Sequence, residues 1–174
     1  MTEDSKPNPC FTHDLCQQWE QQALEAEELG LRVCLLRTGI VLGQGGALSK
    51  LLPLFKLGLG GPLGNGKQWF SWVHIEDLVS MILFLIDNGT CQGPFNATAQ
   101  NPVQNENFTQ TLARVLHRSA FFRIPKWVLC LIFGQMADEL LLHGQRVTPH
   151  KFEKAGFKFN YPELKSALEN ILGI

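Results

Sequence analysis

The chain has 174 residues, a formal net charge of −1 at pH 7 and a hydrophobic share of 45%. This length fits one domain of ordinary size or the end of a larger one, and the composition allows a sizeable core, which excludes general disorder. The near-zero net charge argues against nucleic acid as the main partner, because phosphate binding usually needs a basic surface.

The sequence also argues against a membrane or secreted protein. The longest wholly apolar run, Trp127 to Phe133, is far shorter than the ~20 residues that a membrane span needs. The residues after Met1 contain no apolar signal-peptide core. The five cysteines are an odd, scattered set and not a secreted disulfide framework. We therefore expect a cytoplasmic protein with reduced thiols and no membrane partner.

The front of the chain predicts alternating helices and strands. Apolar residues at helical spacing from Leu15 to Leu29 predict a helix, and Gly30 follows at the C-cap position. Dense apolar runs over 32–37 and 40–42 predict a buried strand that runs into a loop. A helix, a glycine and an apolar strand in this order are typical of a right-handed crossover in an α/β sheet.

The other predicted elements continue this pattern and then become mostly helical. They are helices over 47–57, 76–86, 108–116, 127–142 and 164–172, and strands over 67–73, 93–97 and near Phe157. Pro53 falls inside the first of these helices as a kink. The predicted fold class is α/β in front and mostly helical behind, with a boundary near Pro102 or Arg123.

Two motifs resemble ligand sites but lack an essential part. Gly61 to Lys67 matches the first seven positions of a phosphate-binding P-loop, but Gln68 stands where Ser or Thr holds magnesium, and a predicted strand follows. A loop with tight turns is the favoured interpretation. Cys10, His13 and Cys16 have metal-like spacing but no further ligand pair, so we predict no metal site.

The stretch before the 76–86 helix is the candidate site. If it is a strand, Trp72 and His74 share one face, and Trp69 points the other way. His74 stands at the strand end, where α/β sheets place ligand sites, and an imidazole there could donate a proton or orient a ligand. Core packing of both tryptophans is the alternative. No Gly-x-Ser-x-Gly elbow surrounds Ser71, so a hydrolase is not expected.

Several stretches together carry a family resemblance. They are Arg37-Thr-Gly-Ile-Val-Leu-Gly43, Gly58-Leu-Gly-Gly-Pro-Leu-Gly64, Trp72-Val-His-Ile-Glu-Asp77 and Gly93-Pro-Phe-Asn96, followed by Gly134-Gln-Met-Ala137, Gly144-Gln-Arg-Val147, Pro149 and Gly156-Phe-Lys-Phe159. The first four resemble the second half of the atypical extended short-chain dehydrogenase/reductases, and more narrowly the bacterial epimerase family of NAD(P)-dependent epimerase/dehydratase-like proteins. The later ones resemble that group's small C-terminal domain of unknown function.

The resemblance implies a Rossmann-like fold and two regions. Residues 1–122 would be the C-terminal portion of the NAD(P)-binding domain, and 123–174 the small, mostly helical substrate-side domain. Family members begin with a Rossmann half that bears a Gly-x-Gly-x-x-Gly fingerprint, which this chain lacks because Gly58-Leu-Gly-Gly-Pro-Leu63 fails at its last position. The chain therefore resembles the C-terminal part of such a protein. A lone half-sheet exposes a strand edge and helix faces, so we expect low stability or a homodimer through that surface.

The resemblance also implies roles for individual residues. The residues that would pass close to the nicotinamide end of NADP are Arg37, Thr38, Gly39 and Ile40. The residues that would line the cleft for a small-molecule substrate are Gln68, Trp72 and His74. His74 and Ser71 would orient a carbonyl or hydroxyl group, whereas Asp77 would be a helix-start residue.

Two departures from the family pattern bear on the reaction. Thr12 and Cys16 stand where extended members carry the pair of Tyr-x-x-x-Lys, whose lysine lowers the pKa of the tyrosine. Phe70 and Ser71 stand where nucleotide-sugar epimerases often have Arg-Asp, so a diphosphate would lose its bidentate partner. A nucleotide sugar is therefore not the expected substrate.

Three functional hypotheses remain open from the sequence. The first is the substrate-side portion of an atypical NADP-dependent oxidoreductase or epimerase-like protein, not active as this portion alone. The second is a non-catalytic regulatory protein that keeps the fold as a ligand or redox sensor. The third, an unrelated α/β ligand-binding module, would make the run of motif matches a coincidence.

Overall fold

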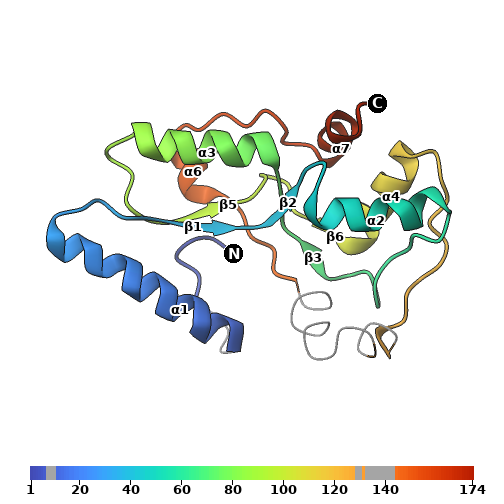
Figure 1. Cartoon of the computed structure of the whole chain (residues 1–174), viewed down its shortest axis with the longest axis horizontal. Helices are drawn as coiled ribbons and strands as arrows, with labels where there is room; N and C mark the ends of the chain where they lie inside the picture. Colours follow the sequence, from blue (N-terminus) through green and yellow to red (C-terminus); the bar gives the residue numbers. More distant parts are fainter. Residues whose placement is uncertain (7–10, 128–130, 132–143) are drawn as a thin grey trace.

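The computed structural model describes residues 1–6, 11–127, 131 and 144–174 (Figure 1). Most of the predicted 127–142 helix, the Gly134–Ala137 stretch and Cys10 lie outside these residues. The helices are α1 (Phe11–Leu24), α2 (Gly46–Lys56), α3 (Ile75–Asp87), α4 (Asn105–Val115), α6 (His150–Lys154) and α7 (Leu164–Leu172), with a 3-10 helix η1 (Glu25–Leu29). The strands are β1 (Cys34–Thr38), β2 (Ile40–Leu42), β3 (Trp69–Phe70), β4 (Trp72–His74), β5 (Gly93–Ala97) and β6 (Val103–Gln104).

Within the described residues the strands pair two by two. β1 pairs with β5 and β2 with β4 in parallel, and β3 pairs with β6 antiparallel. β1 and β2 form one continuous path that changes partner at Gly39 (Figure 1). A Cβ at Gly39 would come 2.7 Å from the Ser71 carbonyl oxygen, which only glycine permits. The parallel pairs and the helix α3 between β4 and β5 confirm the predicted α/β class.

Several elements lie where the periodicity predicts them, within a few residues at their ends. These are α2 with its internal Pro53, α3, α4, α7 and β5. Gly30 ends the first helical region as expected. Its φ is +78°, and its N–H donates to the carbonyls of Ala26 and Glu27.

Two strand predictions are wrong. The predicted strand over 67–73 is divided at Ser71, because β3 and β4 pair with different partners. No strand forms near Phe157, which lies in the turn after α6. There the aromatic residues pack instead of pairing: the Phe157 ring lies 5.5 Å from that of Phe84 and 5.3 Å from that of Phe152.

The core consists of two clusters of buried side chains. One gathers β4, α2, α4 and α7 around Trp72, Leu112 and Leu168. The other joins α3, β5 and α6 around Met81 and Phe152. Because α7 packs against α4, the first cluster contains side chains from both sides of the predicted boundary at 122/123. The division into 1–122 and 123–174 stays a prediction.

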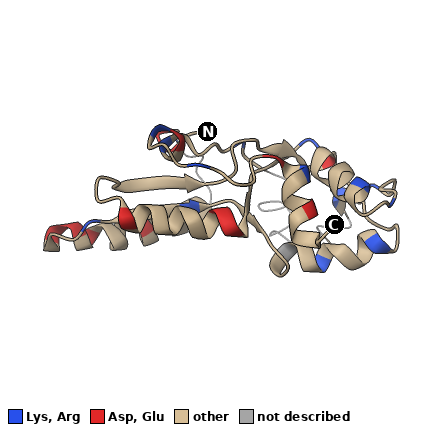
Figure 2. Cartoon of the chain, turned by 90° about the horizontal axis from the view of Figure 1, so that it is seen from above, with Lys and Arg blue, Asp and Glu red and all other residues tan. Residues whose placement is uncertain are grey.

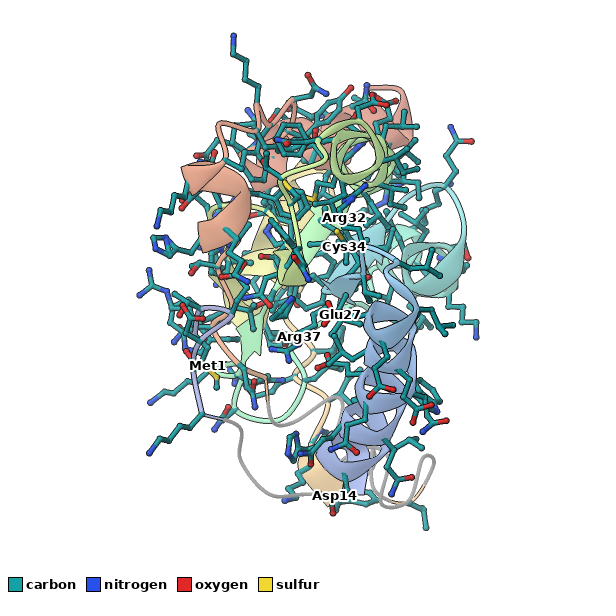
Figure 3. All side chains as sticks on the ribbon, turned by 90° about the vertical axis from the view of Figure 1, so that its left-hand side faces the viewer. Met1, Asp14, Glu27, Arg32, Cys34 and Arg37 are labelled. Atoms are coloured by element: carbon teal, nitrogen blue, oxygen red, sulfur yellow. The ribbon has the colours of Figure 1, made fainter. Side chains whose placement is uncertain are left out.

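The side of the molecule formed by α1 and β1 has no fully buried side chains among the described residues of these two elements. None of the described side chains of α1 is buried, and Trp19, predicted on its apolar face, is 66% exposed. β1, predicted as a buried strand, has only half-buried and exposed residues. The physical reason is that β1 is paired on one edge only, with β5, and no described strand lies along its other edge. Figure 3 labels Arg32, Cys34 and Arg37 on the side of the molecule where α1 lies.

The charges are separated along the molecule. In Figure 2, most of the Lys and Arg positions of the ribbon lie toward the end that holds the C-terminus, and most of the Asp and Glu positions lie toward the opposite end. The acidic end includes Glu25, Glu27 and Glu28 of η1.

Candidate functional site

The carboxyl ends of the parallel strands β1 and β5 define the candidate site. In open α/β sheets, ligands bind at this edge. Thr38 and Ala97 end the two strands in register, and the Gly39 N–H donates to the Ala97 carbonyl at 3.0 Å. The Ile40 N–H donates to the Ser71 carbonyl at 2.8 Å. The fold thus brings the predicted cofactor-facing stretch 37–40 beside Ser71.

The Arg37 side chain is engaged with α1. Its Nε and Nη2 atoms donate to both carboxylate oxygens of Glu20, at 2.7 and 2.6 Å. Nη1 donates to the Glu3 carbonyl at 3.4 Å. Figure 3 shows Arg37 between Met1 and the helix α1. The hydrogen bond to Glu20 raises the pKa of Arg37, which stays charged and fastens α1 to the end of β1.

The Ser71 hydroxyl fastens a segment from the far end of the chain. Its Oγ donates to the Gln145 carbonyl at 2.7 Å and accepts from the Val147 N–H at 3.0 Å. The Asn96 amide donates to the Thr148 carbonyl at 3.1 Å. The segment 144–148 therefore runs across the carboxyl ends of the strands, and Ser71 is a positioning residue in this structure. Gly144–Val147 is part of the family resemblance, and no local signal in the sequence predicts its place at this site.

The segment 144–147 is also packed closely against Trp69. A Cβ on Gly144 would overlap the Trp69 carbonyl oxygen, so this approach requires glycine. Arg146 places its guanidinium carbon 5.1 Å from the centre of the Trp69 ring. This distance is typical of a cation–π contact. The residues that face each other at the rim of the site are therefore Trp69 and Arg146.

His74 is buried rather than open to a ligand. It is 1% exposed, its Nδ1 accepts the Glu76 N–H at 3.1 Å as the N-cap of α3, and its ring stacks on Tyr161 at 3.8 Å. Burial lowers the pKa of His74, against the opposing effect of the Glu76 and Asp77 charges. The ring is thus a neutral imidazole with its proton on Nε2, an atom with no hydrogen-bond partner of normal geometry among the described residues.

Asp77 anchors the segment before α7. It is 1% exposed, and its two carboxylate oxygens accept the N–H groups of Asn160 and Tyr161, each at 2.9 Å. The Tyr161 hydroxyl donates to Glu76 Oε2 at 3.1 Å. Asp77 is therefore more than the expected helix-start residue, since it joins α3 to residues that lie 83 and 84 positions away.

The other two residues predicted to line a cleft are part of the framework. Trp72 is fully buried, and its Nε1 donates to the Asn101 carbonyl at 3.1 Å. The Gln68 amide nitrogen donates to the Leu63 carbonyl at 3.1 Å. Trp72 and His74 are both buried while Trp69 is half-buried, which favours core packing for Trp72 and places Trp69 on the open side.

The P-loop-like stretch is a structural loop. The Leu63 N–H donates to Asn105 Oδ1 at 2.8 Å, and a Cβ on Gly61 would overlap the Phe122 carbonyl oxygen. Gly66 has a φ of +74°. These glycines serve tight packing and turns, as the favoured interpretation states.

The described part of the chain contains neither a metal-binding cluster nor a membrane-spanning helix. Within 1–6, 11–127, 131 and 144–174, no group of three or more His, Cys, Asp or Glu residues could hold a metal ion. No helix in the described part of the chain is both long enough and apolar enough to span a bilayer.

Comparison with known proteins gives two family matches. Residues 2–97 match the NAD dependent epimerase/dehydratase family, and residues 124–171 match a domain of unknown function, DUF1731. The chain is 44% identical over 163 residues to the epimerase family protein SAR0825 of Staphylococcus aureus, with 93% of this chain and 54% of that protein covered. It is 40% identical to the chloroplastic SDR39U1 homolog of Arabidopsis thaliana, with 98% and 49% covered.

A solved structure matches the whole described architecture. The human epimerase family protein SDR39U1 (isoform 2), solved with NADPH, superposes with a TM-score of 0.89 at 34% identity. The match covers 99% of this chain and 59% of the human one. This chain thus spans about half the length of the curated relatives that it matches. The fold is the Rossmann-like fold of the short-chain dehydrogenase/reductase epimerases, and the chain belongs to the NAD-dependent epimerase/dehydratase family.

Proposed function

We propose that this chain is the substrate-side portion of an NADP-dependent oxidoreductase or epimerase-like protein that acts on a small molecule in the cytoplasm. The observation that carries the proposal is the superposition of nearly the whole chain on part of a protein solved with NADPH. The nicotinamide cofactor, when bound, supplies hydride chemistry. The chain's own residues bind and orient the substrate.

The residues at the carboxyl end of β1 fit one end of such a cofactor. Thr38 and Ile40 are exposed there, so this end of the strand is accessible to a ligand. The diphosphate end has no place in this chain, because no Gly-x-Gly-x-x-Gly turn occurs in its sequence. We infer that tight NADP binding needs the portion of the protein that this chain does not contain.

The unpaired edge of β1 is the surface that this other portion would cover. Parallel strands occur almost only in sheets that are covered on both faces, and an open edge invites another strand. Ile82 and Ile86 of α3 are exposed and line a hollow together with Cys34 and Leu36 of β1, and Trp19 of α1 is exposed as well. For the chain alone, a homodimer through the same surface is the expected substitute.

A specific observation supports a non-catalytic alternative. The Ser71 hydroxyl is engaged by Gln145 and Val147, and His74 is buried against Tyr161, so neither side chain offers a free group to a ligand in this conformation. Thr12 and Cys16 also replace the usual tyrosine and lysine. A protein that binds NADP without turnover would be a ligand or redox sensor on the same scaffold.

One experiment tests the proposal and separates the alternatives. The part of the staphylococcal relative that precedes its match to this chain is fused to Met1, and NADPH binding is followed by fluorescence. NADPH oxidation is then measured with a panel of small carbonyl compounds. Binding with turnover supports the oxidoreductase, and binding without turnover across the panel supports the sensor. A folded fusion that does not bind NADPH contradicts both.

A further inference from the structure

The structure brings an arginine to a place where the sequence shows none. Phe70 and Ser71 replace the Arg-Asp pair that would hold a charged substrate group. Arg146 lies next to this pair, because the Ser71 hydroxyl forms hydrogen bonds with the residues on either side of Arg146, Gln145 and Val147. A guanidinium from the far end of the chain therefore stands beside the strand end that lacks one.

The position of Arg146 is fixed by its backbone and by one aromatic ring. The two hydrogen bonds of the Ser71 hydroxyl hold the backbone on both sides of Arg146. The close approach of Gly144 to Trp69 holds the start of the same segment. The N-terminal amino group of Met1 donates to the Arg146 carbonyl. The guanidinium lies over the Trp69 indole, which restricts the side chain before any ligand arrives.

The charge of Arg146 is not neutralised within the described part of the chain. Arg37 and Arg123 each pair with a glutamate, at 2.6 and 3.2 Å, whereas no described carboxylate lies within ion-pair distance of Arg146. Arg146 is also exposed. The N–H donors of a guanidinium lie in the plane of its fork, so a guanidinium that lies over an aromatic face can still donate to an anion.

We propose that Arg146, stacked on Trp69, binds an anionic group of the substrate, either a carboxylate or a phosphate. That the anion belongs to a substrate rests on the proposed function, whereas the anion site itself rests on the contacts of Arg146 with Trp69 and of its neighbours with Ser71. Ser71 joins the two parts of the site, because its hydroxyl holds the Arg146 segment and its carbonyl accepts the Ile40 N–H. The anionic group would thus lie beside the end of the substrate that faces Thr38 and Gly39.

The anion site can be tested on this chain as it stands. The chain is labelled with nitrogen-15 and titrated with inorganic phosphate in one series and succinate in another, at constant ionic strength. The Trp69 indole N–H and the Arg146 Nε–H signals are followed by NMR. We expect saturable shifts in the millimolar range with phosphate, succinate or both, and the series that saturates identifies the anion class.

Three variants separate specific binding from general charge. Arg146→Gln is expected to weaken the anion about tenfold or more, because a charge-assisted bidentate contact is lost. Arg146→Lys is expected to fall between wild type and Arg146→Gln, since it keeps the charge without the planar fork. Arg114→Gln removes an exposed arginine of α4 and is expected to stay within about twofold of wild type.

Equal affinity of wild type and Arg146→Gln, or equal losses in Arg146→Gln and Arg114→Gln, would overturn the anion site. Signal dispersion in each spectrum checks that the variants fold, and the contacts of the Arg146 backbone do not need its side chain. A failure of the proposed function is distinguishable. In that case the fusion protein does not bind NADPH, while the dependence of phosphate or succinate binding on Arg146 persists.

Discussion

His74 makes contacts that depend on its protonation state. Nδ1 accepts the Glu76 N–H, and burial holds the pKa below the ordinary value of about 6.5. In the unfolded chain the His74 imidazole takes up a proton near that pH, whereas in the folded protein it does so only at lower pH. The unfolded state therefore binds more protons there, and the free energy of unfolding falls as the pH drops below about 6.5.

A variant isolates this contribution from the other titrating groups. His74→Asn keeps an N-cap acceptor and removes the titration, at the cost of the stack on Tyr161. Urea midpoints measured at pH 7.5 and 5.5 should show a smaller loss on acidification for the variant than for wild type. The same loss in both proteins would show that His74 does not contribute to it.

His117 is the described non-glycine residue with a left-handed backbone, with φ at +52°, just after the end of α4. Its N–H donates to the Arg114 carbonyl and the Arg118 N–H to the Ala113 carbonyl, the pattern of a helix C-cap that favours glycine. His117→Gly should raise the free energy of unfolding by about 0.5–1 kcal/mol, since relief of the left-handed strain exceeds the entropy lost by a glycine. His117→Ala, which keeps the Cβ, is the control, and a gain of the same size in it would exclude strain as the cause.

At the scale of elements, the contact between α3 and the segment before α7 depends on Asp77. Asp77→Asn leaves one N–H of the Asn160–Tyr161 pair facing an amide NH2 in a buried site, at a cost of about 1–3 kcal/mol in chemical unfolding. Tyr161→Phe keeps the ring and removes the exposed hydrogen bond to Glu76, and it should cost less than about 1 kcal/mol. If the two variants were equally stable, the buried carboxylate would not be the anchor.

The elements also differ in how far the sequence predicts them. α3, α7 and β5 follow from apolar spacing and helix-end residues, because those signals are local. The division of the 67–73 stretch at Ser71 has no local signal, since it depends on β2 and β6, two strands far apart in the chain. Strand alternation does not predict which side chains stay open here, because Val73 is buried like Trp72 and His74. The surroundings of Ser71 depend on Val147, 76 residues away, whose N–H donates to the Ser71 hydroxyl.

At the scale of the whole molecule, we infer that this chain holds the substrate side and the nicotinamide end of a cofactor site whose diphosphate end lies elsewhere. The unpaired edge of β1 and the exposed α1 fit this division. They also explain why a strand predicted as buried is only half-buried here.

The most direct measurement is a calorimetric titration of NADPH into this chain alone and into the fusion with the missing portion, with circular dichroism of both samples as a check of folding. We expect no measurable NADPH binding by the folded chain alone and micromolar NADPH binding by the fusion. Micromolar NADPH binding by the chain alone would contradict this division of the cofactor site and would place the whole site within these 174 residues.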